Sequence, residues 1–85
     1  MLKVLLGAPS RRFLKKCETE LHKRLMRKIR ELAENPFPSD MKRVEGKKEK
    51  VFRVRVGDYR VQYVVFYEKN EVLISDIDKR PRAYD

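Results

Sequence analysis

The stretch Phe52-Arg-Val-Arg-Val-Gly-Asp-Tyr-Arg-Val-Gln-Tyr63 decides much of the fold. Apolar and polar residues alternate on both sides of Gly57 and Asp58, a pattern with the two-residue side-chain period of a half-buried strand. Only these two residues separate the runs, and a glycine in the first position suits a type II′ turn. The stretch therefore predicts a tight antiparallel β-hairpin.

Counting outward from the turn gives the register of this hairpin. Arg55 is expected opposite Arg60, and Arg53 opposite Gln62. Because side chains alternate, these four polar residues share one face of the hairpin. The other face is apolar and should cover the core; it holds Phe52, Val54, Val56, Tyr59, Val61 and Tyr63.

The expected pairing of Arg55 with Arg60 places like charges directly opposite each other, which opposes folding by up to roughly 1 kcal/mol. Two explanations are open. Asp76 or Asp78, further along the chain, could neutralise the arginines on an exposed sheet face. Alternatively, an anion completes the site, since the guanidinium fork suits bidentate contact to phosphate oxygens.

The rest of the chain predicts a strand and two helices before the hairpin. Residues 1–6 alternate as a strand closed by Gly7, and Ser10 is a candidate N-cap of a short helix that reaches Cys17. Apolar residues at helical spacing predict a second helix from about Thr19, a plausible N-cap, to near Asn35. Prolines at 36 and 38 cannot continue it.

Residues 36–50 read as a charged surface connection with a short strand possible at 41–44, and strands are expected at 51–56, 59–67 and 72–77. Lys69 and Asn70 should lie in the second turn. The chain is thus predicted to form one α+β domain over residues 1–85, in which an N-terminal strand and a helical hairpin precede antiparallel strands, with the helices packed on one face of the sheet. The pattern does not decide which later strand pairs with the first.

The composition indicates the kind of partner. Lys and Arg number 22 against 13 Asp and Glu, a formal net charge of +9, which favours a partner of dense negative charge over a merely soluble basic domain. One cysteine and no long apolar segment predict a reducing, cytoplasmic location without a membrane span. The single histidine, His22, predicts neither a metal site nor a catalytic triad, and no cofactor is expected.

Further basic residues could extend an RNA-binding surface around the hairpin arginines. In RNA cleavage a ribose 2′-hydroxyl attacks the adjacent phosphate, and cations stabilise the charge on its oxygens. Arginine stays protonated in proteins, so Tyr84 is the candidate for proton transfer or for orienting a base. The other candidates for RNA contact are Gln62, Lys79, Arg80, Arg82, Lys47 and Lys48.

The chain resembles the RelE branch of the RelE/ParE toxin superfamily over nearly its whole length. The resemblance is carried by Glu-Asn-Pro-Phe at 34–37, Val-Glu-Gly at 44–46, the hairpin stretch and Ile-Asp-Lys-Arg-Pro-Arg-Ala-Tyr at 77–84. It implies a type II toxin that enters the ribosomal A site, cuts mRNA there without a metal, and is held inactive in a hetero-oligomer by a cognate antitoxin protein.

The resemblance also implies a catalytic set at the matching positions, namely Arg53, Arg55, Arg60, Arg80 and Tyr84. Two departures stand out. Many relatives have histidine where this chain has Lys79, and several have lysine at positions 53 and 55. Two other functions therefore stay open: a ParE-like inhibitor of DNA gyrase, and a catalytically silent homologue that only binds RNA or its antitoxin.

Overall fold

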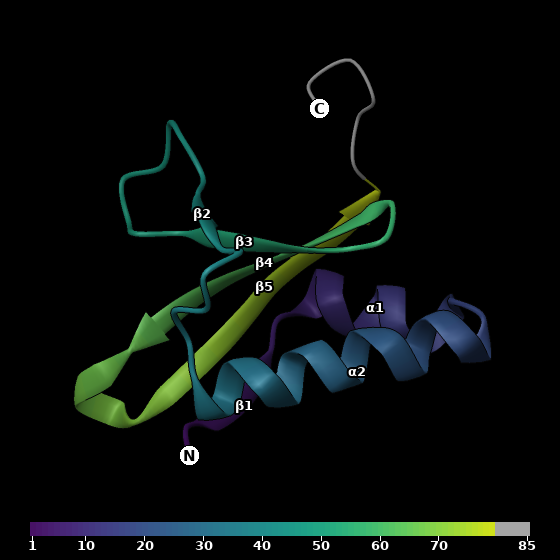
Figure 1. Ribbon diagram of the computed structural model, residues 1–85, viewed down its shortest axis with the longest axis horizontal. Coiled ribbons are helices and arrows are strands. Elements are labelled where there is room, and N and C mark those ends of the chain that lie inside the picture. Colours follow the sequence, from purple (N-terminus) through teal and green to yellow (C-terminus); the bar gives the residue numbers. More distant parts are fainter. Residues whose placement is uncertain (80–85) are drawn as a thin grey trace.

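The computed structural model describes residues 1–79 and contains, in that range, two α-helices on one face of a five-stranded sheet (Figure 1). The strand order is β1-β5-β4-β3-β2; β1 runs parallel to β5, and all other neighbours are antiparallel. The predicted α+β architecture is confirmed. The elements are β1 (Lys3–Leu6), α1 (Ala8–Lys16), α2 (Thr19–Glu34), β2 (Lys42–Arg43), β3 (Phe52–Val56), β4 (Tyr59–Phe66), the 3₁₀ turn η1 (Tyr67–Lys69) and β5 (Glu71–Lys79).

The two helices form an antiparallel hairpin, and each begins earlier than its predicted cap residue would allow. Gly7 is the N-cap residue of α1, so Ser10 lies inside the helix instead of capping it, and its buried hydroxyl donates a hydrogen bond to the Ile74 carbonyl oxygen at 2.9 Å. Thr19 is the first residue of α2, and Glu18 holds the cap position. Neither helix in this part of the chain is long and apolar enough to span a membrane.

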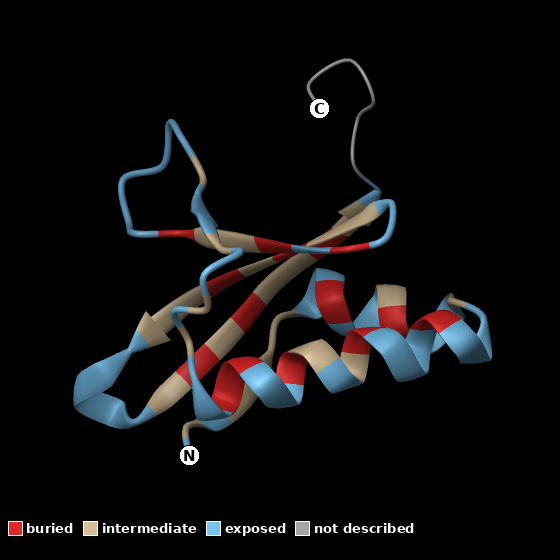
Figure 2. Ribbon diagram, in the orientation of Figure 1, coloured by how far each residue is buried: buried red, intermediate tan, exposed pale blue. Residues whose placement is uncertain are grey.

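The core lies between α2 and the sheet, where the buried residues of both layers face each other (Figure 2). Leu25, Ile29 and Leu32 of α2 are completely buried at the helical spacing expected from the sequence. They join the fully buried sheet residues Val54, Val61, Tyr63, Val72 and Ile74. Burying side chains of this size stabilises a fold by about 1.5–3 kcal/mol each.

Tyr63 connects this core to the segment that follows α2. Its hydroxyl donates a hydrogen bond to the Pro36 carbonyl oxygen at 2.7 Å, and its ring lies 5.9 Å from that of Phe52. Burial, together with the Asp40 carboxylate, raises the pKa of Tyr63 far above its ordinary value. The polar end of this side chain thus fixes where the chain leaves the helix.

Two different turns flank β4: a two-residue turn joins it to β3, and a 3₁₀ turn joins it to β5. Gly57 has φ +60° while Asp58 does not have a positive φ, as a type II′ turn requires, and the β3–β4 register is the one predicted. The second turn is η1 followed by Asn70 in the left-handed conformation. From there the β4–β5 ladder runs regularly until Tyr63, where a bulge at Ser75 inserts one extra residue into β5.

Candidate RNA-binding face

Arg53, Arg55 and Arg60 lie on the face of the sheet that the helices leave open. The observed pairs are Arg53 with Gln62 and Arg55 with Arg60, while the apolar residues between them point toward the helices. Arg53 is half-buried and Arg55 is exposed. The structure therefore confirms that the hairpin brings three arginines and one glutamine together on one face.

Asp78 neutralises one of these arginines. Arg60 Nε donates to Asp78 Oδ1 at 3.0 Å and Arg60 Nη2 donates to Asp78 Oδ2 at 2.8 Å, so the contact is a two-point fork. Gln62 Nε2 lies 3.5 Å from the same Oδ2. Of the two explanations for the Arg55–Arg60 pairing, neutralisation by an acidic residue of the next strand holds for Arg60.

The bulge at Ser75 is what places Asp78 there. Below the bulge the pairs are Phe66 with Glu71 and Tyr63 with Ile74, and above it they are Gln62 with Asp76 and Arg60 with Asp78. Because of the extra residue, both carboxylates point to the open face. Ser75 also donates its hydroxyl to the Gln62 carbonyl oxygen at 3.3 Å.

The other two hairpin arginines have no such partner in this part of the molecule. Within residues 1–79, neither Arg53 nor Arg55 makes an ion pair with a carboxylate, and Asp76 likewise has no ion-pair partner there. Two guanidinium groups on the open face are thus uncompensated by Asp or Glu within that range. An anion such as RNA phosphate could interact with both.

A hollow of about 510 Å³ adjoins the arginines on the same face. Its lining includes the apolar side chains Val64 and Phe66 of β4 and Leu73 of β5. Gln62 and Lys47, two of the predicted RNA-contacting residues, also line it, together with the acidic residues Glu49 and Asp76. The loop that carries Lys47 and the exposed Lys48 connects β2 to β3. The structure thus brings Gln62 and Lys47 near the arginine face.

The remaining candidates are not all placed on this face. Lys79 is paired with Tyr59, a residue of the helix-covered face, so the ladder register places Lys79 on the side of the sheet away from the arginines. Arg80, Arg82 and Tyr84 lie outside the described residues. Their predicted roles stay predictions.

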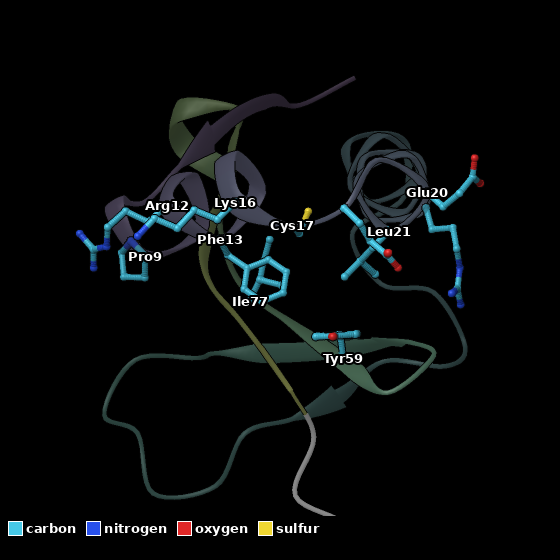
Figure 3. Close-up of a pocket in the computed structure, with 11 residues that line it drawn as sticks. Pro9, Arg12, Phe13, Lys16, Cys17, Glu20, Leu21, Tyr59 and Ile77 are labelled. Atoms are coloured by element: carbon cyan, nitrogen blue, oxygen red, sulfur yellow. The ribbon is translucent and has the colours of Figure 1, made fainter.

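A second hollow, of about 610 Å³, lies on the helix side of the sheet (Figure 3). Phe13 and Tyr59 meet edge to face there with ring centroids 5.5 Å apart, and Ile77 lies beside them. Arg12 and Lys16 of α1 stand at its rim. The sheet separates this hollow from the arginine face, so the two surfaces are distinct.

The chemistry of the open face is that of charge stabilisation. Among residues 1–79 no group of three or more His, Cys, Asp and Glu could hold a metal ion. The three arginines can bind and polarise a phosphate, but they cannot remove a proton at neutral pH. Asp78 is the residue of this face whose role the sequence left undecided, because its orientation depends on a bulge that no residue pattern announces.

Comparison with known proteins identifies the family. Residues 9–84 match the family model described as the ParE toxin of the type II toxin-antitoxin system parDE. A relative from Methanocaldococcus jannaschii, named as a toxin RelE1, is 38% identical in an alignment 87 positions long, which covers 81% of this chain and 96% of that protein.

Solved structures agree with this fold. The archaeal RelE–RelB complex from Pyrococcus horikoshii gives a TM-score of 0.81 at 25% identity, covering 95% of this chain and 97% of that one. The intact RelBE toxin-antitoxin complex of Escherichia coli gives a TM-score of 0.82 at 20% identity, covering 96% and 100%. The chain therefore belongs to the RelE/ParE superfamily of type II toxins, in its RelE branch.

Proposed function

We propose that this toxin is a ribosome-dependent endoribonuclease that cleaves mRNA in the A site and so inhibits translation. The observation that carries the proposal is the clustering of Arg53, Arg55 and Arg60 on the open face of the sheet. A phosphodiester passing through its transition state gathers negative charge on its non-bridging oxygens. Fixed cations at that position lower the barrier because they need no reorganisation during the reaction.

The reaction uses a nucleophile that the substrate itself provides, so it requires no metal ion. The ribose 2′-oxygen forms a bond to phosphorus, the bond from phosphorus to the 5′-oxygen breaks, the 2′-hydroxyl proton is lost and the leaving oxygen gains a proton. Arg80 and Tyr84 join the catalytic set in this proposal by resemblance. A phenol with an ordinary pKa of about 10 needs neighbouring cations to act as a base near neutral pH.

A cognate antitoxin protein is part of the proposal. The solved relatives from Pyrococcus horikoshii and Escherichia coli are complexes of RelE with RelB. A partner segment rich in acidic and apolar residues would suit a chain of net charge +9. We infer that such a partner forms a hetero-oligomer with this toxin and blocks its activity.

The test adds purified toxin to ribosomes programmed with a defined mRNA and maps the new mRNA ends. Cuts confined to the A-site codon support the proposal. The variant Arg60→Ala should lose cleavage and growth arrest while it still folds and binds its antitoxin, because a cation of the active face is gone. Full cleavage by Arg60→Ala would overturn the assignment of this face.

Arg27→Ala is the matched control, because it removes the same charge from an exposed position of α2, on the side of the sheet away from the arginines. It should cleave at the wild-type rate. Absence of cuts together with inhibition of DNA supercoiling would instead identify a gyrase inhibitor. Absence of both would identify a silent homologue.

A further inference from the structure

Asp78 has no part in the proposed mechanism, yet its carboxylate is the described group in closest contact with a proposed catalytic arginine. We propose that Asp78 is a positioning residue that orients the Arg60 guanidinium for the phosphate undergoing cleavage. This inference rests on the proposed function and adds an acidic residue to the otherwise cationic site.

The geometry of the contact supports orientation over simple charge balance. A guanidinium group is planar, so two bonds from different nitrogens to one carboxylate fix its plane as well as its position. Here the bonds join Nε to Oδ1 and Nη2 to Oδ2, at 3.0 and 2.8 Å. A charge contact through a single nitrogen would fix the position of the guanidinium but not its plane.

Two residues of β4, Arg60 and Gln62, contact the Asp78 carboxylate. Asp78 lies directly opposite Arg60 in the β4–β5 ladder, and Gln62 Nε2 approaches its Oδ2 at 3.5 Å from the same face. The exposed fractions of the Arg60 and Asp78 side chains are 25% and 34%, so bulk water screens the pair only in part. Both residues of the pair lie on paired strands, Arg60 on β4 and Asp78 on β5. A functional group on a strand is positioned more accurately than one on a loop.

If a carboxylate positions Arg60, its removal should affect RNA binding and cleavage differently. Asp78 is negative, so it repels the RNA phosphate that the neighbouring arginines attract. Removing its charge should therefore leave RNA binding unchanged or make it tighter. The same change should slow cleavage, because Arg60 loses its fixed orientation. A residue that served only to reduce the positive charge of the face would affect cleavage in the opposite direction.

The experiment measures binding and cleavage separately for Asp78→Asn. Cleavage is followed under single-turnover conditions with saturating toxin on programmed ribosomes. Binding is measured on ribosomes whose A-site codon carries 2′-deoxyriboses, which lack the attacking hydroxyl. We expect the cleavage rate to fall by about 10- to 100-fold, with affinity equal to or above that of the wild type.

Asp76→Asn is the matched control. Asp76 lies two residues away on the same strand and the same face, but it is paired with Gln62 and makes no ion pair within residues 1–79. Its replacement removes the same charge and should not slow cleavage. Equal slowing by both variants would mean that the contact between Asp78 and Arg60 is not what the reaction needs, and would overturn the inference.

A double-mutant cycle decides whether Asp78 acts through Arg60. If it does, Asp78→Asn should not slow cleavage further in an Arg60→Lys background, which keeps the charge at position 60 but lacks the guanidinium fork. Asp78→Glu, which keeps the carboxylate, should recover part of the lost rate, and thermal melting of each variant shows whether it is folded. Wild-type toxin that fails to cut mRNA refutes the proposed function. Wild-type cutting with an unaffected Asp78→Asn variant refutes only this inference.

Discussion

Replacing Tyr63 with phenylalanine removes one oxygen from a completely buried side chain and leaves the ring in place. The lost hydrogen bond, from the hydroxyl to the Pro36 carbonyl oxygen, is 2.7 Å long. A typical protein hydrogen bond contributes about 0.5–1.5 kcal/mol, and a carbonyl left without its donor adds to the cost. We expect the free energy of unfolding at pH 7 to fall by about 1–2 kcal/mol.

The loss of folding stability at alkaline pH provides a second, independent test that the Tyr63 side chain is buried. The pKa of Tyr63 is raised in the folded protein, so folding requires the protonated phenol. Its contribution is fully present below the unfolded pKa of about 10 and is lost as the pH rises toward the folded value. Between pH 9 and pH 11 the wild type should lose about 1.4 kcal/mol more than Tyr63→Phe, because the ionised phenol is favoured only in the unfolded chain.

Urea denaturation followed by far-UV circular dichroism, at pH 7 and at several values up to pH 11, measures both effects. Tyr67→Phe is the control, since Tyr67 is 64% exposed and should change neither quantity. Parallel stability curves for the wild type and Tyr63→Phe across the alkaline range would show that the Tyr63 pKa is not raised. The reasoning from burial would then be refuted.

Three further predictions concern the stability of the fold. Ser10→Ala should cost about 0.5–1.5 kcal/mol, because it removes one buried hydrogen bond while the Ile74 carbonyl oxygen still accepts the Gly7 N–H, and a fall in the melting temperature would show it. Gly57→Ala should cost about 1–2 kcal/mol because φ is +60° there, whereas Gly57→Asn should cost less in the same melting assay. The Lys28 hydrogen bond lowers the pKa of Asp40, so this pair stabilises the fold above about pH 4 and the contribution is lost as the pH falls below that range. Asp40→Asn should therefore flatten the acid limb of the stability curve while costing less than about 1 kcal/mol at pH 7 in urea denaturation.

Local sequence rules predicted the β3–β4 hairpin well because a two-residue turn leaves no freedom of register. The same rules misplaced Ser10, whose preference for a helix cap competes with a carbonyl 64 positions away in the chain. The parallel pairing of β1 with β5 was likewise out of reach, since it joins the two most distant strands.

The β4–β5 pairing shows why the positions of Asp76 and Asp78 could not be predicted from the sequence. A regular ladder continued from the pairing of Phe66 with Glu71 would set Asp76 against Val61 and Asp78 against Tyr59, turning both carboxylates toward the helices. The bulge at Ser75 reverses this and carries them to the open face. The positions of Arg53, Arg55 and Arg60 followed from the sequence, whereas Arg80 and Tyr84 were named by family resemblance alone.

The strand order has a consequence for how this toxin is made. β5 is synthesised after all the other strands, yet it lies between β1 and β4 and is hydrogen-bonded to both. A nascent chain that has emerged only as far as Phe66 can close the β3–β4 hairpin, but β1 has no neighbour to join and Arg60 has no Asp78. The five-stranded sheet, and with it the contact between Arg60 and Asp78, can therefore assemble only after β5 has left the ribosome.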